Sequence, residues 1–98
     1  MKVSIITATY NSASVLEQCI KSVLEQSYKN IEYIIIDNCS IDATLDIART
    51  YEEGIDRIVS EPDKGIFDAL NKGIQIASGD LIGFLHADDF YADNTVIE

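Results

Sequence analysis

The chain alternates between short apolar runs and longer segments whose apolar residues recur at helical spacing. The apolar runs are each followed by polar residues and predict strands at residues 3–7, 31–36, 55–59 and 81–85. The run at 31–36 is rich in β-branched residues, as expected of a strand that is buried on both faces. Because strand and helix patterns alternate, we predict an α/β fold built on a parallel sheet.

Three helices are expected between these strands. The first opens at residues 11–14, where Ser14 and Glu17 have the spacing of a capping box. The second is expected to start at Ser40 and to stop near Gly54. A third follows Gly65, and residues 91–98 resemble the first turns of another helix. The inward-facing positions of the three helices are predicted to be Val15, Leu16, Cys19, Ile20, Val23 and Leu24, then Ile41, Leu45, Ala48 and Tyr51, then Ile66, Leu70, Ile74 and Ala77.

The order of the strands follows from the handedness of their connections. Right-handed crossovers leave few possible sheets, and with the first and fourth strands as central neighbours the order is 3-2-1-4. We therefore predict a single Rossmann-like domain over residues 1–98, with helices on both faces of the sheet. The loops after residues 7, 36 and 85 would then meet at the carboxyl edge, where open α/β sheets bind ligands.

Size and charge narrow the possible functions. The 98 residues suffice for one domain with one core. Seven basic residues face seventeen acidic ones, and this net charge of −10 argues against a nucleic-acid partner. No apolar run approaches the roughly 20 residues of a membrane span. The two cysteines, Cys19 and Cys39, are expected to be reduced thiols in a cytosolic protein.

The strand at 81–85 leads into His86, Ala87, Asp88 and Asp89, which is the most informative stretch of the chain. A buried strand that delivers two adjacent carboxylates to the ligand edge predicts either a divalent-cation site or an acid/base site. The strongly negative net charge favours the cation, because a metal ion would let an acidic protein hold an anionic ligand. In isolation, the same acid pair would be a solvated turn before the next helix.

Two other loops are expected to border this site. Asn11 is expected to cap the first helix, and Ser40 the second. Asp37 follows an apolar strand, so it either presents its carboxylate to a base or ribose or makes a structural hydrogen bond. Lys64, before the third helix, either adds charge to an anion site at the helix N-terminus or lies in a solvated loop.

Five segments of the chain, taken in order, resemble the inverting family-2 glycosyltransferases, which have the nucleotide-diphospho-sugar transferase fold. The likeness extends over essentially the whole chain. Its segments are residues 4–11, 22–27, 34–44, 63–73 and 77–89.

The resemblance implies a nucleotide-sugar donor, a glycan or lipid-linked acceptor and a divalent metal, Mn²⁺ or Mg²⁺. The residues that it implies in donor binding are Thr7, Ala8, Thr9, Tyr10, Asp37, Asn38, Asp63, His86 and Ala87. Asp88 matches the metal-binding acid of an Asp-x-Asp motif, and Asp89 stands beside it. The implied activity is metal-assisted sugar transfer in polysaccharide biosynthesis, in the cytoplasm or at the inner face of the membrane, with possible peripheral membrane association of the full-length enzyme.

The chain departs from the family pattern at three positions. His86 replaces the first acid of the motif, Asn38 replaces a second acid after the strand, and Leu70 replaces an arginine. The family's general base lies further along, so no catalytic residue is assigned here. We therefore expect the donor-binding half of a catalytic domain that binds nucleotide weakly on its own and associates with itself through an uncovered sheet edge.

Other classes of protein that contain a parallel sheet fit the sequence less well. A non-catalytic nucleotide-binding or regulatory domain of the same fold remains an alternative. A phospho-accepting receiver domain needs acids after its first strand, where this chain has Thr7, Ala8 and Thr9. A dinucleotide-binding oxidoreductase needs a G-x-G-x-x-G loop at that position, which is absent.

Overall fold

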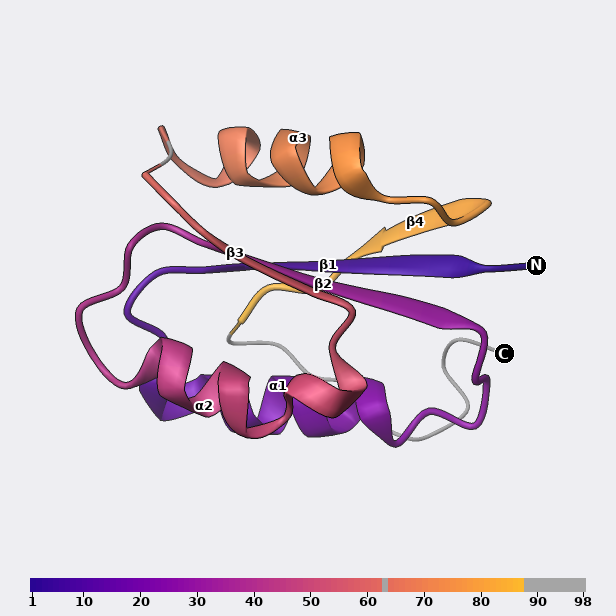
Figure 1. Cartoon of the computed structure of the whole chain (residues 1–98), viewed down its shortest axis with the longest axis horizontal. Coiled ribbons are helices and arrows are strands. Elements are labelled where there is room, and N and C mark those ends of the chain that lie inside the picture. The colour runs from indigo at the N-terminus through magenta and orange to yellow at the C-terminus, as the bar shows by residue number, and fades with distance from the viewer. Residues whose placement is uncertain (63, 88–98) are drawn as a thin grey trace.

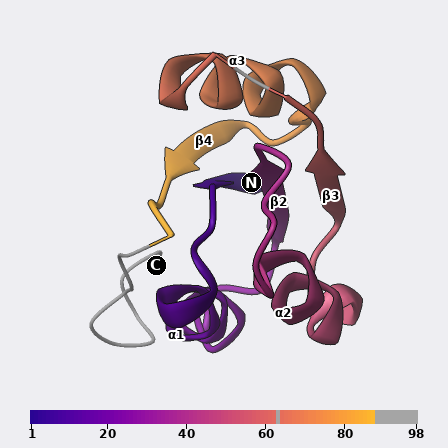
Figure 2. The same ribbon diagram turned by 90° about the vertical axis from the view of Figure 1, so that its left-hand side faces the viewer.

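The fold is a parallel sheet between two helical layers, described by a computed structural model over residues 1–62 and 64–87 (Figure 1). The elements in chain order are β1 (Val3–Thr9), α1 (Ala13–Leu24), β2 (Ile31–Asp37), α2 (Thr44–Thr50), the 3₁₀ turn η1 (Glu52–Gly54), β3 (Arg57–Ser60), α3 (Ile66–Ile76) and β4 (Leu81–Phe84). Helices α1 and α2 cover one face of the sheet and α3 covers the other (Figures 1 and 2). The predicted α/β class and the presence of helices on both faces are confirmed.

The strand order is β3-β2-β1-β4, and all neighbours are parallel, as predicted. The central pair β1 and β2 is in register from Val3 opposite Ile31 to Thr9 opposite Asp37. Both strands therefore end at the same level, so the loops that follow them start side by side. Strand β4 pairs with the first half of β1, from Val3 opposite Leu81 to Ile6 opposite Phe84. The prediction that this strand is buried was wrong, because β4 lies at the edge of the described sheet and most of its side chains are exposed.

Each face of the sheet has its own buried cluster. On the side of α1, the strand residues Ile5, Tyr33 and Ile35 pack with helix residues that include Leu16 and Ile20. On the side of α3, a smaller cluster consists of Ile6, Ile34, Ile36 and Ala69. Alternate residues of each central strand therefore face opposite layers, which explains why the apolar run in β2 is continuous.

Helix α1 opens within the predicted residues 11–14, but its predicted capping box and the predicted start of α2 were wrong. Helix α1 begins at Ala13 without a side-chain capping bond, so Ser14 and Glu17 form no capping box. Helix α2 begins at Thr44, four residues after the predicted start at Ser40. The residues around both starts instead bind one another across the two loops that follow β1 and β2.

Among the described residues, three predicted inward positions are exposed. Ile41 lies before α2 and is 89% exposed, Ile74 of α3 is 42% exposed, and Val15 of α1 is 37% exposed. Helix α3 turns Ala69 and Gly73 toward the sheet, and an added Cβ at Gly73 would come within 2.6 Å of the Ile6 side chain. Helix α3 therefore lies closer to β1 than it could if the larger Ile74 side chain faced the sheet, as the sequence predicted.

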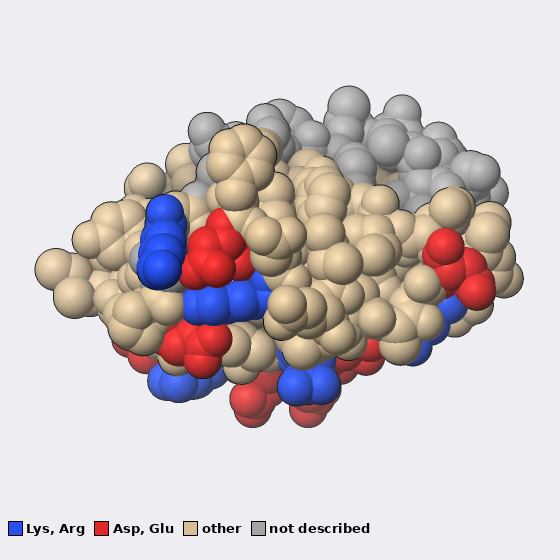
Figure 3. Space-filling view, turned by 90° about the horizontal axis from the view of Figure 1, so that it is seen from above, with Lys and Arg blue, Asp and Glu red and all other residues tan. Residues whose placement is uncertain are grey.

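The surface on the α3 side has small groups of opposite charge next to one another (Figure 3). There, Lys72 lies 3.2 Å from Glu61 and 3.8 Å from Asp68. Within the described part of the chain, no helix is long and apolar enough to cross a bilayer. The helix predicted at residues 91–98 lies outside the described residues.

Candidate functional site

The ends of β1 and β2 are joined by the carboxylate of Asp37. One carboxylate oxygen accepts hydrogen bonds from the hydroxyls of Thr9 (2.6 Å) and Ser40 (2.6 Å). The other accepts from the Ser40 amide (2.8 Å) and the Ser60 hydroxyl (3.0 Å). Asp37 is completely buried. Both oxygens of Asp37 therefore make structural hydrogen bonds, one of the two roles considered for this residue, and its contact with a base or ribose stays a prediction.

Asn11 ties the loop after β1 to the loop after β2. Its amide donates to the hydroxyl of Ser40 (2.8 Å), and its side-chain oxygen accepts from the amide of Ile41 (2.9 Å). This reciprocal pair holds Asn11 in the left-handed region, at a φ of 46°. Cys39, in the facing loop, has a φ of 47°. Tyr10 precedes Asn11, and its side chain is 60% exposed.

The first turn of α1 is capped from the other loop. The amide of Ser12 donates to the Thr44 hydroxyl (2.7 Å), and the amide of Ala13 donates to the carboxylate of Asp42 (3.2 Å). Asp42 also accepts from the amide (3.0 Å) and the hydroxyl of Thr44. The hydroxyl bond from Thr44 contributes most to holding the pKa of Asp42 below its ordinary value, assisted by the amide bonds and opposed by desolvation.

The chain leaving β4 turns back onto the α1 layer. Leu85 donates its amide to Ile6 (3.0 Å), and Leu85 and Ala87 are buried on either side of the exposed His86. The carbonyl of His86 lies 3.5 Å from the thiol of Cys19, which donates to it. This contact places the end of the described chain beside the carboxyl end of β1.

The loop before α3 makes a more local set of contacts. The amide of Lys64 donates to the carboxylate of Asp68 (3.0 Å), and the Lys72 ammonium donates to the carbonyl of Pro62 (2.7 Å). A carboxylate of α3 itself therefore already binds an amide just before the helix. The amide of Lys64 is already bonded, so this helix N-terminus has less capacity to bind an external anion than the sequence suggests.

The structure brings most of the predicted donor-binding residues to one edge of the sheet. The last residues of β1 and β2 and the residues that follow β1, β2 and β4 gather there: Thr7, Ala8, Thr9, Tyr10, Asp37, Asn38, His86 and Ala87. Thr7, Thr9, Asp37 and Ala87 are buried, whereas Tyr10 and His86 present exposed side chains. Asp63, Asp88 and Asp89 lie outside the described residues, so their roles remain predictions. Within residues 1–62 and 64–87, no three His, Cys, Asp or Glu side chains form a group that could hold a metal.

Sequence reasoning missed the hydrogen bonds that join the first two loops. It treated Ser40 and Asn11 as helix caps and gave Asp42 and Thr44 no contact with the first loop. The available signal was the density of short polar residues in both loops, since such side chains readily bond to backbone amides. Which amides they bind depends on the register of β1 against β2, and only the structure supplies that register.

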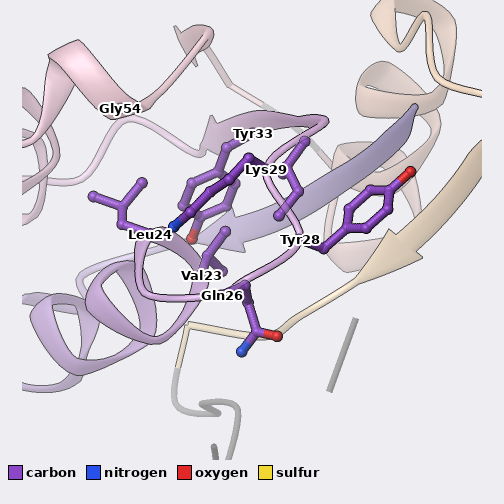
Figure 4. A pocket seen from close by; sticks show the side chains of 8 residues that line it. Val23, Leu24, Gln26, Tyr28, Lys29, Tyr33 and Gly54 are labelled. Atoms are coloured by element: carbon purple, nitrogen blue, oxygen red, sulfur yellow. The ribbon is translucent and has the colours of Figure 1, made fainter. Parts of the chain in front are cut away.

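A pocket of about 160 Å³ opens at the other end of the sheet, near the start of β2 (Figure 4). Its lining mixes apolar and polar side chains: Val23, Leu24, Gln26, Tyr28, Lys29, Ile31, Tyr33 and Gly54. In the close-up, the Leu24 and Tyr33 side chains lie near one another, whereas Gln26 and Tyr28 point elsewhere. This pocket includes none of the predicted donor-binding residues, so the carboxyl edge remains the candidate site.

Comparison with known proteins agrees with this geometry. The sequence profile of Glycosyl transferase family 2 matches residues 4–98. The chain belongs to this family. An uncharacterized glycosyltransferase of Mycobacterium tuberculosis is 42% identical over 96 residues, which cover 97% of this chain and 37% of the relative. The putative teichuronic acid biosynthesis glycosyltransferase TuaG of Bacillus subtilis is 41% identical over 90 residues, covering 89% of this chain and 36% of TuaG.

Solved structures that were determined with nucleotide sugars share the fold. The mannosyltransferase PcManGT from Pyrobaculum calidifontis, in complex with GDP-Man and Mn²⁺, matches with a TM-score of 0.87 and 27% identity, over 95% of this chain and 29% of that one. S. aureus TarS in complex with UDP-GlcNAc matches with a TM-score of 0.85 and 27% identity, over 92% of this chain and 27% of that one. This family-2 chain thus spans little more than a third of the curated relatives and less than a third of these structures.

Proposed function

We propose that this chain is the donor-binding part of a glycosyltransferase that moves a sugar from a nucleotide-sugar donor to a glycan or lipid-linked acceptor. The observation that carries the proposal is the family match over residues 4–98, together with the meeting of three polar strand ends at one edge. The place in polysaccharide biosynthesis is suggested by relatives such as TuaG. We place this activity in the cytoplasm or at the inner face of the membrane.

In this proposal, the described residues form the walls of the nucleotide pocket. The exposed ring of Tyr10 offers a face on which a base can stack, and Asn38 offers an amide to its edge. Thr9 and Asp37 act beneath them by holding the two strand ends together. His86, exposed beyond β4, is directed to the sugar or the phosphates.

In this proposal, the metal ion is bound by the acidic residues that follow Ala87. Carboxylate oxygens are the donors that Mn²⁺ and Mg²⁺ prefer, and β4 leads toward the carboxyl edge just before these acids. Asp88, with Asp89 beside it, would hold the ion, which when bound supplies Lewis-acid assistance to the departure of a nucleoside diphosphate. The likeness to PcManGT, which was solved in complex with GDP-Man and Mn²⁺, supports a metal in the reaction, and the choice of Asp88 rests on the sequence motif.

The test is a calorimetric titration of the 98-residue chain with UDP and with GDP, with and without MnCl₂. We expect weak binding that Mn²⁺ strengthens, and we expect Asp88→Ala to abolish the effect of Mn²⁺. Asp46→Ala is the matched control, because it removes an equal charge from an exposed position on α2. Absence of nucleotide binding under all conditions would contradict the proposal, and an unchanged Mn²⁺ effect in Asp88→Ala would remove Asp88 from its role.

Catalysis by this chain alone is expected to be slight, because no general base is assigned within it. A radiochemical assay with a nucleotide-sugar panel would measure transfer to added acceptors. Robust transfer by the purified 98 residues would show that the base lies within them. The alternative function, a non-catalytic nucleotide-binding domain, would be favoured if a longer chain bound donors without releasing sugar.

A further inference from the structure

Three consecutive backbone amides lead into α1, and each donates to a side chain of the loop after β2 or of the first residue of α2. The amide of Asn11 binds the Ser40 hydroxyl, that of Ser12 binds the Thr44 hydroxyl, and that of Ala13 binds the Asp42 carboxylate. The three donor–acceptor distances are 2.8, 2.7 and 3.2 Å. We call this set of contacts between the two loops the loop clasp.

The loop clasp occupies a place that often binds phosphate. In parallel α/β folds, the first helix presents free amides and the positive end of its dipole to an anion. Here the anion is the chain's own Asp42, which Thr44 holds in place through two further bonds. A donor phosphate would have to displace Asp42 to bind these amides. The N-terminus of α1 therefore stabilises the fold and does not bind the ligand.

We propose that Asp42 and Thr44 are positioning residues for the nucleotide: through the loop clasp they fix the loop that carries Tyr10 against the loop that carries Asn38. The inference deepens the proposed function and rests on it, because Tyr10 and Asn38 are the residues directed to the base. Neither Asp42 nor Thr44 touches the nucleotide. They act by ordering both walls of the pocket before the ligand arrives.

The backbone conformation explains why the walls need external support. Tyr10 lies between Thr9, anchored on Asp37, and Asn11, which has a positive φ. A non-glycine residue adopts that conformation only when its surroundings impose it. The reciprocal bonds of Asn11 to the facing loop impose it locally, and Thr44 and Asp42 continue the connection into α1. Without these bonds, the binding of the nucleotide would itself have to order the two loops, and this would lower the affinity for the nucleotide.

The first test uses two pairs of variants in the 98-residue chain and measures the dissociation constants of UDP and GDP. Thr44→Val removes the hydroxyl at nearly constant volume, and Thr44→Ser restores it. Asp42→Ala removes the cap, and Asp46→Ala is the charge-matched control on the same segment. We expect Thr44→Val and Asp42→Ala to weaken the better-bound nucleotide about tenfold, as disordered loops cost affinity. Thr44→Ser and Asp46→Ala should bind like the wild type.

A stability control separates positioning from general damage. Glu32→Ala removes contacts at the opposite end of the sheet, where the partly buried Glu32 binds Ser4 and Ser78. It should lower the midpoint of urea unfolding but leave nucleotide affinity unchanged. Equal affinity losses in Glu32→Ala and Asp42→Ala, at equal losses of stability, would overturn the positioning role.

Amide hydrogen exchange tests the loop clasp without any nucleotide. In Asp42→Ala, the amides of Ser12 and Ala13 should exchange faster, while those of β2 keep their protection. If this change occurs but the wild type binds no nucleotide, the proposed function fails and the loop clasp stands as a structural feature only. If exchange and affinity are both unchanged in Asp42→Ala, the inference itself is wrong.

Discussion

Asp37 shows how a single side chain can decide the shape of the candidate site. It accepts four hydrogen bonds from three other residues, on two strands and one loop. A carboxylate has acceptor sites for all four, whereas any other side chain of this size would leave at least one donor unpaired in a buried setting. The two strand ends that border the site therefore depend on this charge.

Replacing Asp37 by Asn tests that dependence. The amide group of Asn would face donors that need an acceptor, and hydrogen bonds to a charged group are stronger than those to a neutral one. We expect the free energy of unfolding to fall by about 1–3 kcal/mol, measured by urea denaturation. Asp46→Asn, on the surface of α2, should change it by less than about 0.5 kcal/mol. An unchanged midpoint in Asp37→Asn would show that the contacts of Asp37 contribute little.

The lowered pKa of Glu32 predicts how the free energy of unfolding depends on pH. Burial raises the pKa of Glu32, but bonds from the Ser78 amide and the Ser4 and Ser78 hydroxyls, with the charge of Lys2, outweigh burial, so the net pKa lies below its ordinary value of 4.5. A carboxylate with a lowered pKa stabilises the fold above its unfolded-state pKa, and this stabilisation is lost as the pH falls through the folded-state value.

The variant Glu32→Gln should therefore be less stable than the wild type at neutral pH, and the difference should shrink in acid. Urea unfolding of both proteins across this range measures the two curves. A difference that stays constant with pH would mean that the lost contacts matter but the charge does not.

Among the elements, periodicity predicted the strands and the layers, because the hydrophobic effect places those residues. The strand order was predicted from the right-handedness of the connections. The cap of α1 and the start of α2 were not predicted, because local capping signals competed with bonds from distant residues. Ser14 and Glu17 have the right spacing for a capping box, yet Asp42 binds the first helical amide across 29 positions of sequence. For the candidate site, the sequence predicted which loops lie close together. It could not predict which atoms form the hydrogen bonds between them, because these depend on the register of β1 against β2.

Helix α3 provides an element-level test at Gly73. An alanine there would gain about 1 kcal/mol of helix propensity, but its Cβ would meet two carbons of the buried Ile6 at 2.6 and 2.9 Å. Since overpacking costs about 1–3 kcal/mol, we expect Gly73→Ala to lower the melting temperature, followed by circular dichroism. Gln75→Ala, at an exposed position of the same helix, should be neutral or slightly stabilising. A higher melting temperature in Gly73→Ala would mean that α3 can move away from β1.

At the scale of the whole molecule, the two edges of the sheet differ. Strand β3 carries the exposed charge of Arg57. Strand β4, at the other edge, has no charged residue, and its Leu81, Ile82 and Phe84 are 41–53% exposed. Uncharged, apolar edge strands pair readily with other chains.

We therefore expect the 98-residue chain to associate with a second copy through β4. Sedimentation velocity should show a concentration-dependent dimer, and Ile82→Lys should shift it to monomer by placing a charge on the edge. Val15→Lys is the control, because Val15 has a similar exposure on α1. A dimer that survives Ile82→Lys but not Val15→Lys would place the contact on the helical face instead.

The isoleucines of the second cluster, Ile6, Ile34 and Ile36, are shielded by a helix that comes later in the chain than both strands that carry them. During translation, a nascent chain that has emerged only through β3 exposes these side chains to water, because α3 has not yet been made. Pairing of β4 with the first residues of the chain comes later still. Ribosome-bound intermediates should accordingly be substrates for chaperones until α3 docks.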